Sequence, residues 1–196
     1  MDFNDTKEEA AFRAEARAWL DANAEKLGPG ERRESPLGGE GRKGLVGRAR
    51  GWQRTKADAR WACITWPTEY GGRGASSLQN VVWNQEENRY RVPPNLFTIG
   101  QGMLGPTIMA HGTPEQKKRY LQPMLRADEI WCQLSSEPAA GSDLAGLRTS
   151  AVRDGKDWVL NGQKIWTSGA HYCKWGMIVT RTDPAAKKHA GITYFI

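Results

Sequence analysis

The stretch that decides the fold is WCQLSSEPAAGSDLAG (residues 131–146), which begins as an apolar strand and changes abruptly to small and hydroxylated residues. Ser135 and Ser136 fall at the end of this strand, where hydroxyls and main-chain amides are free to face a polar heterocycle. The Gly141–Ser142 step predicts a tight turn that exposes N–H groups to an anion. The stretch therefore suits a flat ligand that carries both ring heteroatoms and phosphates.

A second stretch, GQKIWTSG (residues 162–169), repeats this arrangement. Trp166 offers a broad apolar plane, and Thr167 and Ser168 offer hydroxyls beside it. Two hydroxylated strand ends and one indole would together enclose a conjugated ring. The alternative from composition is that serine, glycine and proline only form turns here, while Trp166 fills a core.

The chain before Asp128 is predicted to be mostly helical, because apolar residues recur at helical spacing. Asp5 or Thr6 is the expected N-cap of the first helix, and Thr113 with Pro114 begins the last one. Glycine, arginine and glutamate dominate residues 28–51, which predicts a mobile loop that leads into a short helix. The predicted helices cover residues 6–27, 77–92 and 113–125.

Beyond Asp128, short alternating runs of valine, isoleucine, tryptophan and threonine predict β-strands. Asp154–Gly155 and Asn161–Gly162 are signals of tight hairpins, which favour antiparallel neighbours. The fold class expected is α+β, with a helical N-terminal domain (residues 1–128) and an antiparallel β middle domain (residues 129–196). That β domain is expected to be incomplete, because Ile196 falls within a strand.

Composition limits the class of protein. Hydrophobic residues make up 39% and charged residues 26% of the chain, and nine tryptophans are present, which is typical of a globular protein. No apolar run approaches the roughly 18 residues of a membrane span, and the acidic N-terminus is unlike a signal peptide, so a cytoplasmic protein without a membrane partner is expected. The net charge of +6 is spread along the chain, which favours a solvated surface over a nucleic-acid partner.

Several motifs are present without the context that their chemistry needs. Two GxGxxG matches, at Gly39–Gly44 and Gly100–Gly105, lack the preceding buried strand of a dinucleotide site. The three cysteines are widely separated, which predicts reduced thiols and neither a disulfide framework nor a zinc site. No metal site is expected, since the histidines also lack ligand spacing; these residues are Cys63, Cys132, Cys173, His111, His171 and His189.

The segment 131–184 resembles the middle region of the acyl-CoA dehydrogenase family, whose pattern runs T/S-E-P-x-A-G-S-D and then N-G-x-K-x-W-x-T/S. Upstream, CITWPTEYGGRG (residues 63–74) and HGTPEQKKRYLQPMLR (residues 111–126) resemble the family's helical domain. The variants WCQLSSEP and IWTSGAH, with KHAGITYF near the end, are most similar to actinobacterial members that act on bulky or sterol-derived acyl-CoAs.

The resemblance implies a helical N-terminal domain, a β middle domain and a C-terminal four-helix domain, with FAD as cofactor. It places the strand Gln133, Leu134, Ser135 and Ser136 along the flavin, with Gly141 and Ser142 near the pyrophosphate or the CoA portion of the substrate. By the same resemblance, Trp166 and Thr167 lie at the isoalloxazine, and Ser168 bonds near flavin N5.

The family places the floor of its acyl pocket in residues 95–109, which assigns Thr98 and Gly102, with Ser142, to substrate binding. Gly100, Gly102 and Gly105 predict a roomy pocket, because they remove side chains where other members carry bulk. Close helix packing is the alternative explanation of these glycines. Ala139 stands where the common family loop has glycine, which predicts some crowding.

The implied reaction is α,β-dehydrogenation of an acyl-CoA thioester to the trans-2-enoyl-CoA, with electrons passed to an electron-transfer flavoprotein. No catalytic residue is assigned, since the family's catalytic glutamate belongs to the C-terminal domain; Glu137 and Asp143 are read as structural. Turnover by this chain alone is not expected. The alternatives are a non-catalytic binding or assembly subunit of the same fold and a single-stranded nucleic-acid binder. A homo- or hetero-oligomer is expected by family analogy.

Overall fold

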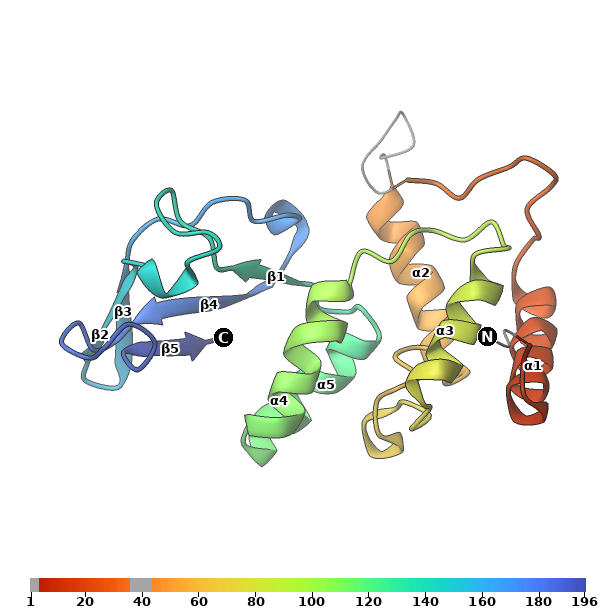
Figure 1. Cartoon of the computed structure of the whole chain (residues 1–196), viewed down its shortest axis with the longest axis horizontal. Helices are drawn as coiled ribbons and strands as arrows, with labels where there is room; N and C mark the ends of the chain where they lie inside the picture. Colours follow the sequence, from red (N-terminus) through yellow and green to blue (C-terminus); the bar gives the residue numbers. More distant parts are fainter. Residues whose placement is uncertain (1–3, 36–43) are drawn as a thin grey trace.

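The computed structural model describes residues 4–35 and 44–196 and contains helices followed by a mixed β-sheet (Figure 1). The α+β fold class expected from the sequence is confirmed. Within the described residues no helix is long and apolar enough to cross a membrane. The α-helices are α1 (Lys7–Asn23), α2 (Leu45–Asp58), α3 (Ser77–Glu87), α4 (Gly105–His111) and α5 (Pro114–Leu125). The strands are β1 (Trp131–Leu134), β2 (Ser150–Asp154), β3 (Asp157–Asn161), β4 (Trp175–Arg181) and β5 (Ile192–Phe195).

Reciprocal capping boxes fix where three of the helices begin. In each box a hydroxyl accepts a hydrogen bond from the N3 amide, and the N3 side chain accepts one from the cap amide, so two otherwise unpaired donors are satisfied. Thr6, not Asp5, caps α1, and Thr113 caps α5 with Pro114 at its first position, as predicted. The boxes are Thr6 with Glu9, Ser76 with Gln79, and Thr113 with Gln116.

Helix α2 begins earlier than the sequence analysis predicted. Residues 28–51 were expected to form a loop, whereas the structure is helical from Leu45 onward. Leu45, Ala49 and Gln53 recur every four residues and are buried, so this face of α2 packs against the rest of the molecule despite Gly47 and Gly51. Gly39 and Gly41 of the first GxGxxG match lie outside the described residues.

An aromatic cluster joins α1 and α3 to the segment that follows α2. The rings of Trp61 and Trp83 are stacked, with centroids 4.6 Å apart and planes 17° from parallel. Trp19 lies within 6.0 Å of both rings, and the Arg73 guanidinium lies 4.0 Å from the centroid of Trp61. Large rings in such contacts contribute beyond their buried area. The cluster accounts for much of the high tryptophan count.

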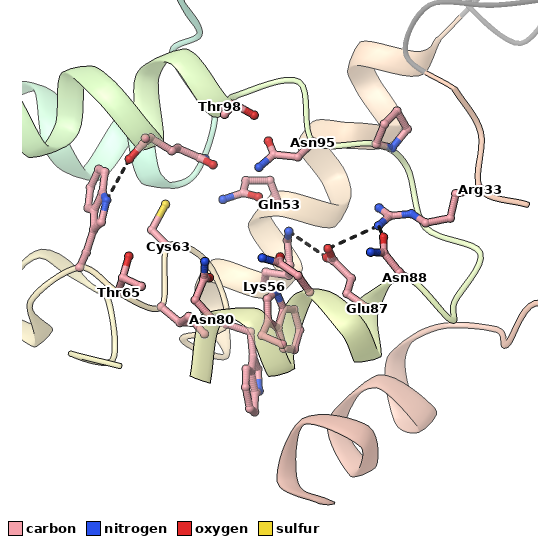
Figure 2. A pocket seen from close by; sticks show the side chains of 18 residues that line it. Arg33, Gln53, Lys56, Cys63, Thr65, Asn80, Glu87, Asn88, Asn95 and Thr98 are labelled. Carbon is pink, nitrogen blue, oxygen red and sulfur yellow. Dashed lines mark hydrogen bonds and ion pairs between the residues drawn. The ribbon is translucent and has the colours of Figure 1, made fainter. Parts of the chain in front are cut away.

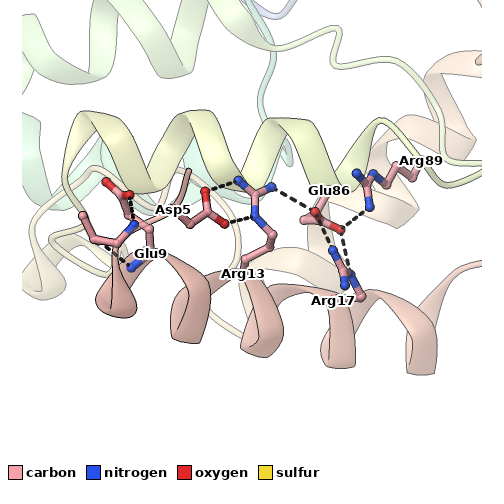
Figure 3. A network of polar contacts seen from close by, with 7 residues as sticks. Asp5, Glu9, Arg13, Arg17, Glu86 and Arg89 are labelled. Carbon is pink, nitrogen blue, oxygen red and sulfur yellow. Dashed lines mark hydrogen bonds and ion pairs between the residues drawn. The ribbon is translucent and has the colours of Figure 1, made fainter. Parts of the chain in front are cut away.

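A fully buried carboxylate ties α1 to α3 (Figure 3). The side chain of Glu86 accepts hydrogen bonds from Arg13 at 3.0 Å and from Arg17 at 3.1 Å, two residues that lie one turn apart on α1. Burial alone would raise the pKa of Glu86, but the hydrogen bonds from Arg17 and Arg13 lower it. Glu86 therefore remains ionised and holds the two helices together.

The sheet is mixed rather than purely antiparallel. Strand β4 lies at its centre and runs parallel to β1 and β2, while β5 pairs with it antiparallel. The Asp154–Gly155 signal is confirmed by the two-residue turn between β2 and β3, with Gly155 at φ 58°. The Asn161–Gly162 prediction is wrong: after β3 the chain leaves the sheet, and residues 162–174 return it to β4, which lies between β1 and β2.

Glu129 connects the helices to the sheet. Its carboxylate accepts hydrogen bonds from Arg119 of α5 at 2.9 Å, from Lys174 at 2.6 Å and from the Trp175 indole at 2.8 Å. The Arg119 guanidinium, with Lys174 and Trp175, lowers the pKa of Glu129 to about 2. Beside this contact, Trp131 of β1 packs with α5 residues in one apolar core. The face of β1 that carries Trp131 and Gln133 therefore meets the helical region.

Candidate functional site

A small pocket lies where β1 ends. Its volume is about 160 Å³, and it is bounded by side chains from β1, from the following serines and from the segment after β3. Gln133 donates a hydrogen bond to the Ser135 hydroxyl at 2.8 Å, which orients both groups at the pocket wall. The lining residues are Ile99, Gln133, Ser135, Ser136, Ile165, Trp166 and Ser168. The two stretches singled out in the sequence therefore meet at one place.

Backbone contacts bring the two stretches together. The amide of Ile165 donates to the carbonyl oxygen of Ser136 at 2.9 Å. The Lys164 ammonium donates to the carbonyl oxygen of Ser135 at 3.1 Å and to the Glu137 carboxylate at 2.9 Å. Sequence reasoning quoted Lys164 only as part of a motif and gave it no role. A single lysine carries no separate signal in the sequence, so only the structure reveals its positioning contacts.

Glu137, for which a structural role is predicted from the sequence, has its carboxylate held by contacts within the fold. It is buried and accepts hydrogen bonds from the amides of Arg148 at 2.7 Å and Thr149 at 2.9 Å. Burial alone would raise the pKa of Glu137, but hydrogen bonds from Thr149, Arg148 and Lys164 lower it to about 2. Both carboxylate oxygens of Glu137 accept hydrogen bonds within the fold. Glu137 thus closes the loop 138–147 and neutralises Lys164, and it does not face the pocket.

Trp166 is the most conspicuous wall of the pocket. Its side chain is 86% exposed, although it is the kind of residue that normally gains most from burial. Its backbone has φ 58°, a left-handed conformation that is uncommon for a bulky residue. Such conformations cluster at functional sites, where neighbouring contacts fix them. The expectation that Trp166 ends a strand is wrong, since β3 stops at Asn161, but the indole does stand at the pocket.

Four of the nine residues predicted to contact the cofactor do not line the pocket. Leu134 alternates with Gln133 along β1 and packs instead against Gly176 on the other side of the strand. Thr167 is half-buried, and Gly141 and Ser142 are exposed in the loop after Glu137. Neighbouring Ala139 is also exposed and has no positive φ, so its methyl group is not strained.

A larger pocket lies on the helical side of the segment 98–102. Its volume is about 510 Å³, and Thr98, Gln101 and Gly102 line it, whereas Ile99 lines the small pocket at β1. Residues Gly100–Leu104 form one turn of π-helix that continues into α4. Such turns occur often at functional sites. One segment therefore borders both pockets.

The three glycines of this segment have different roles. A Cβ at Gly105 would lie 2.1 Å from the Trp66 ring, and one at Gly100 would lie 3.2 Å from Met124, so these two glycines permit close packing. A Cβ at Gly102 would meet only Thr98, at 3.8 Å. The helix-packing alternative is correct for Gly100 and Gly105, and Gly102 alone leaves room in the larger pocket.

The cysteines and other titratable groups do not add a second centre. All three cysteines are free, and burial raises the pKa of Cys63, at the larger pocket, to about 12, so its thiol is protonated. Among the described residues no group of three or more metal-binding side chains is found. The chemistry of the site therefore rests on hydroxyls, amides and the exposed indole.

The chain belongs to the acyl-CoA dehydrogenase family. The model of the family's N-terminal domain matches residues 6–128, and the model of its middle domain matches residues 132–196. This agrees with the helices, the sheet and the pocket between them.

Curated relatives from mycobacteria are similar over most of the chain. Acyl-CoA dehydrogenase IpdE1 of Mycobacterium tuberculosis (strain ATCC 25618 / H37Rv) is 41% identical over 186 residues, which are 94% of this chain and 48% of that protein. Acyl-CoA dehydrogenase FadE34 of the same strain is 51% identical over 131 residues, 67% of this chain and 18% of that protein. The chain thus spans about half the length of IpdE1, and its match covers a smaller part of FadE34.

Solved structures show the same fold. The ChsE4–ChsE5 complex from Mycobacterium tuberculosis superimposes with a TM-score of 0.75 and 35% identity, over 99% of this chain and 48% of that chain. The steroid acyl-CoA dehydrogenase Tcur3481–Tcur3483 gives a TM-score of 0.75 and 36% identity, over 99% of this chain and 48% of that chain. Both relatives are two-component assemblies by their names.

Proposed function

We propose that this chain forms the helical and β portions of an FAD-dependent acyl-CoA dehydrogenase. The proposed reaction is α,β-dehydrogenation of an acyl-CoA thioester to the trans-2-enoyl-CoA, with electrons passed to an electron-transfer flavoprotein. The observation that carries the proposal is the convergence of the β1 end and residues 165–168 on one pocket. Membership of the acyl-CoA dehydrogenase family supports the reaction class.

The residues at the small pocket fit a flavin ring. The uncovered Trp166 indole supplies an apolar plane for a flat heterocycle, and Ser136 and Ser168 supply hydroxyls for its polar edge. FAD, when bound there, supplies the hydride acceptor for oxidation of the Cα–Cβ bond. Hydrogen-bond donors that are fixed before the reaction stabilise charge as it develops. Ser142 and Gly141, in the exposed loop, remain candidates for phosphate contacts.

Positioning residues hold this surface in place. Lys164 and Glu137 fix the carbonyl group of Ser135, and the Ile165 amide fixes that of Ser136, so the two hydroxyl-bearing segments keep one relative position. No carboxylate is among the described residues that line the small pocket, so none of these residues is assigned the role of base. The proposed base lies on the C-terminal four-helix domain that family members carry.

The test measures flavin bound by the purified chain and acyl-CoA-dependent dye reduction, the latter with and without a polypeptide that carries the family's C-terminal domain. We expect Ser136→Ala and Trp166→Ala to weaken flavin binding at least tenfold. Trp158→Ala is the matched control, since this tryptophan lies on β3 away from the pocket. Absence of flavin and of dye reduction in every combination would refute the proposal. Dye reduction only in the presence of a paralogous subunit would instead support the assembly role.

A further inference from the structure

The larger pocket differs in character from the small pocket at β1. It lies among α2, α3, the segment 61–66 and the segment 94–102, and its volume of about 510 Å³ is within the range of small-molecule sites (Figure 2). Its buried side chains include four apolar ones, Trp61, Ile64, Trp66 and Trp83, and four that are polar or charged, Gln53, Lys56, Glu87 and Gln101. Buried polar and charged side chains of this kind, which we call the floor of the pocket, are not needed to bind a hydrocarbon chain.

The charges at the floor do not cancel. Lys56 Nζ lies 3.0 Å from Glu87 Oε1, and Arg33 Nη1 lies 3.8 Å from Glu87 Oε2. These three are the charged residues of the lining, so two cations face one carboxylate. The Trp52 indole also donates a hydrogen bond to Glu87 Oε1, at 2.9 Å. This bond occupies an acceptor site of the Glu87 carboxylate, whereas the N–H donors of the Lys56 ammonium are not involved in it. The pocket therefore keeps a net positive charge and spare donors.

Uncharged polar groups surround this floor. The side chains of Asn80 and Asn84, one turn apart on α3, make no hydrogen bond to the described residues, nor do the hydroxyls of Thr65 and Thr98. Figure 2 shows the labelled side chains gathered around one space. A methyl-terminated chain in this space would remove water from these groups and replace none of their hydrogen bonds, which costs free energy. A ligand that carries oxygen atoms would instead form new hydrogen bonds to these side chains in place of those that they make to water.

The position of this pocket links it to the proposed reaction. Thr98 and Gly102 line it, and Ile99, between them in sequence, lines the pocket proposed for the flavin. Gly102 also leaves open space, since a Cβ there would have only the Thr98 methyl group within 4 Å. An acyl group bound for oxidation at the small pocket therefore has the larger pocket across the segment 98–102.

We propose that the larger pocket selects acyl-CoA substrates whose acyl group carries a hydrogen-bond-accepting oxygen group, a carboxylate above all, at the end remote from the thioester. This inference rests on the proposed function, because it takes the ligand to be the acyl part of a CoA thioester. Lys56 and Arg33 attract the oxygen group, and the amides of Asn80 and Asn84 bond to it. Gln53 completes the polar floor.

Binding of two matched thioesters to the 196-residue chain tests the proposal by calorimetry. Octanoyl-CoA ends in a methyl group, whereas suberyl-CoA has the same chain length and ends in a carboxylate. A third thioester, 7-oxooctanoyl-CoA, carries an uncharged ketone oxygen near its end and so shows how much of the affinity depends on charge. We expect suberyl-CoA to bind at least tenfold more tightly than octanoyl-CoA, with the ketone between them. Equal affinities, a preference for octanoyl-CoA, or no binding of any thioester would overturn the proposal.

Variants locate the effect. Arg33→Gln/Lys56→Met/Glu87→Gln removes all three charges of the lining without leaving a lone buried charge, and should abolish the preference for the carboxylate. Asn84→Leu, at an exposed position, should reduce it severalfold, and Gly102→Leu should weaken all three thioesters by filling the pocket. Lys117→Met and Gly47→Leu are the controls, since both residues lie outside this pocket. A preference that persists in the triple variant would overturn the proposal.

Flavin binding, measured in the same preparations, distinguishes the two failures. Selectivity for suberyl-CoA without any bound flavin would refute the dehydrogenase proposal and leave the substrate proposal standing. Flavin binding and dye reduction with octanoyl-CoA preferred would sink the substrate proposal alone.

Discussion

The helical region and the sheet region use the same residue types in opposite ways. In the helical region Trp61 is 3% exposed, stacked on Trp83 and covered by Arg73. In the sheet region Trp166 is 86% exposed and held in a left-handed backbone conformation. The first tryptophan stabilises a core, and the second presents a surface. The difference shows that backbone contacts, such as that of the Ile165 amide with the carbonyl oxygen of Ser136, hold a tryptophan at the surface without burial of its ring.

The largest expected effect tests the difference between the buried and the exposed tryptophan directly. Trp61→Ala should lower the free energy of unfolding by about 3–5 kcal/mol, because it removes a buried ring that is stacked on Trp83 and covered by Arg73. Trp166→Ala should change it by less than about 0.5 kcal/mol, since the side chain is mostly in solvent. Urea unfolding followed by circular dichroism measures both. Similar losses for the two variants would remove the distinction between core and surface indoles.

The next effect concerns the support beneath the small pocket. Glu137→Ala leaves Lys164 buried without its counter-ion, which should cost about 3 kcal/mol. Asp58→Ala serves as the control: its pair with Arg126 is solvent-exposed and should contribute less than about 1 kcal/mol. Chemical denaturation of both variants gives the comparison. A loss at Glu137 as small as that at Asp58 would show that the loop does not need the carboxylate.

Acid should weaken the same support and the helix–sheet junction together. The pKa values of Glu137 and Glu129 are lowered to about 2 from an ordinary value of 4.5. Their stabilisation is complete above pH 4.5 and is lost as the pH falls toward 2, by on the order of 2 kcal/mol for each group. Unfolding midpoints between pH 6 and pH 2.5 measure this, with Glu137→Gln expected to reduce the slope. A stability independent of pH in this window would contradict the assignment.

A helix cap provides the smallest effect and sharpens the contrast from the helical side. Ser76→Ala removes the side-chain oxygen that accepts from the Gln79 amide and should cost about 1 kcal/mol. Ser77→Ala, one residue further on and without a cap bond, should be neutral within about 0.5 kcal/mol. Thermal unfolding of the two variants measures this difference in stability. Equal stabilities would mean that α3 is held by packing alone.

Local patterns in the sequence predicted the elements whose causes are local. Thr113 followed by Pro114 marked the start of α5, and Asp154–Gly155 marked the β2–β3 turn, because caps and tight turns depend on a few adjacent residues. The start of α2 at Leu45 was missed, since glycine and arginine outweighed the four-residue spacing of its buried face. Only tertiary contacts settle such a competition.

The candidate site was predicted in outline and not in its construction. Ser136 and Trp166 were paired through chemistry and family resemblance, and the structure brings both to one pocket. The parallel pairing of β1 with β4 and the contacts of Lys164 with Ser135 link residues far apart in sequence. No short-range pattern encodes them. The polar floor at Lys56 and Glu87 was invisible for the same reason, because charged residues on helices are usually solvated.

Strand β3 has a practical consequence for anyone who handles this protein. Within residues 4–35 and 44–196 it lies at one end of the sheet path and pairs with β2 alone, and it exposes all five of its residues, Val159 and Leu160 among them. An unpaired edge with apolar side chains is a template for strands of other molecules, and neighbouring charges such as Asp157 and Lys156 are the residues that discourage such association. Concentrated solutions at high ionic strength, which screens these charges, are therefore the conditions in which this chain should first self-associate.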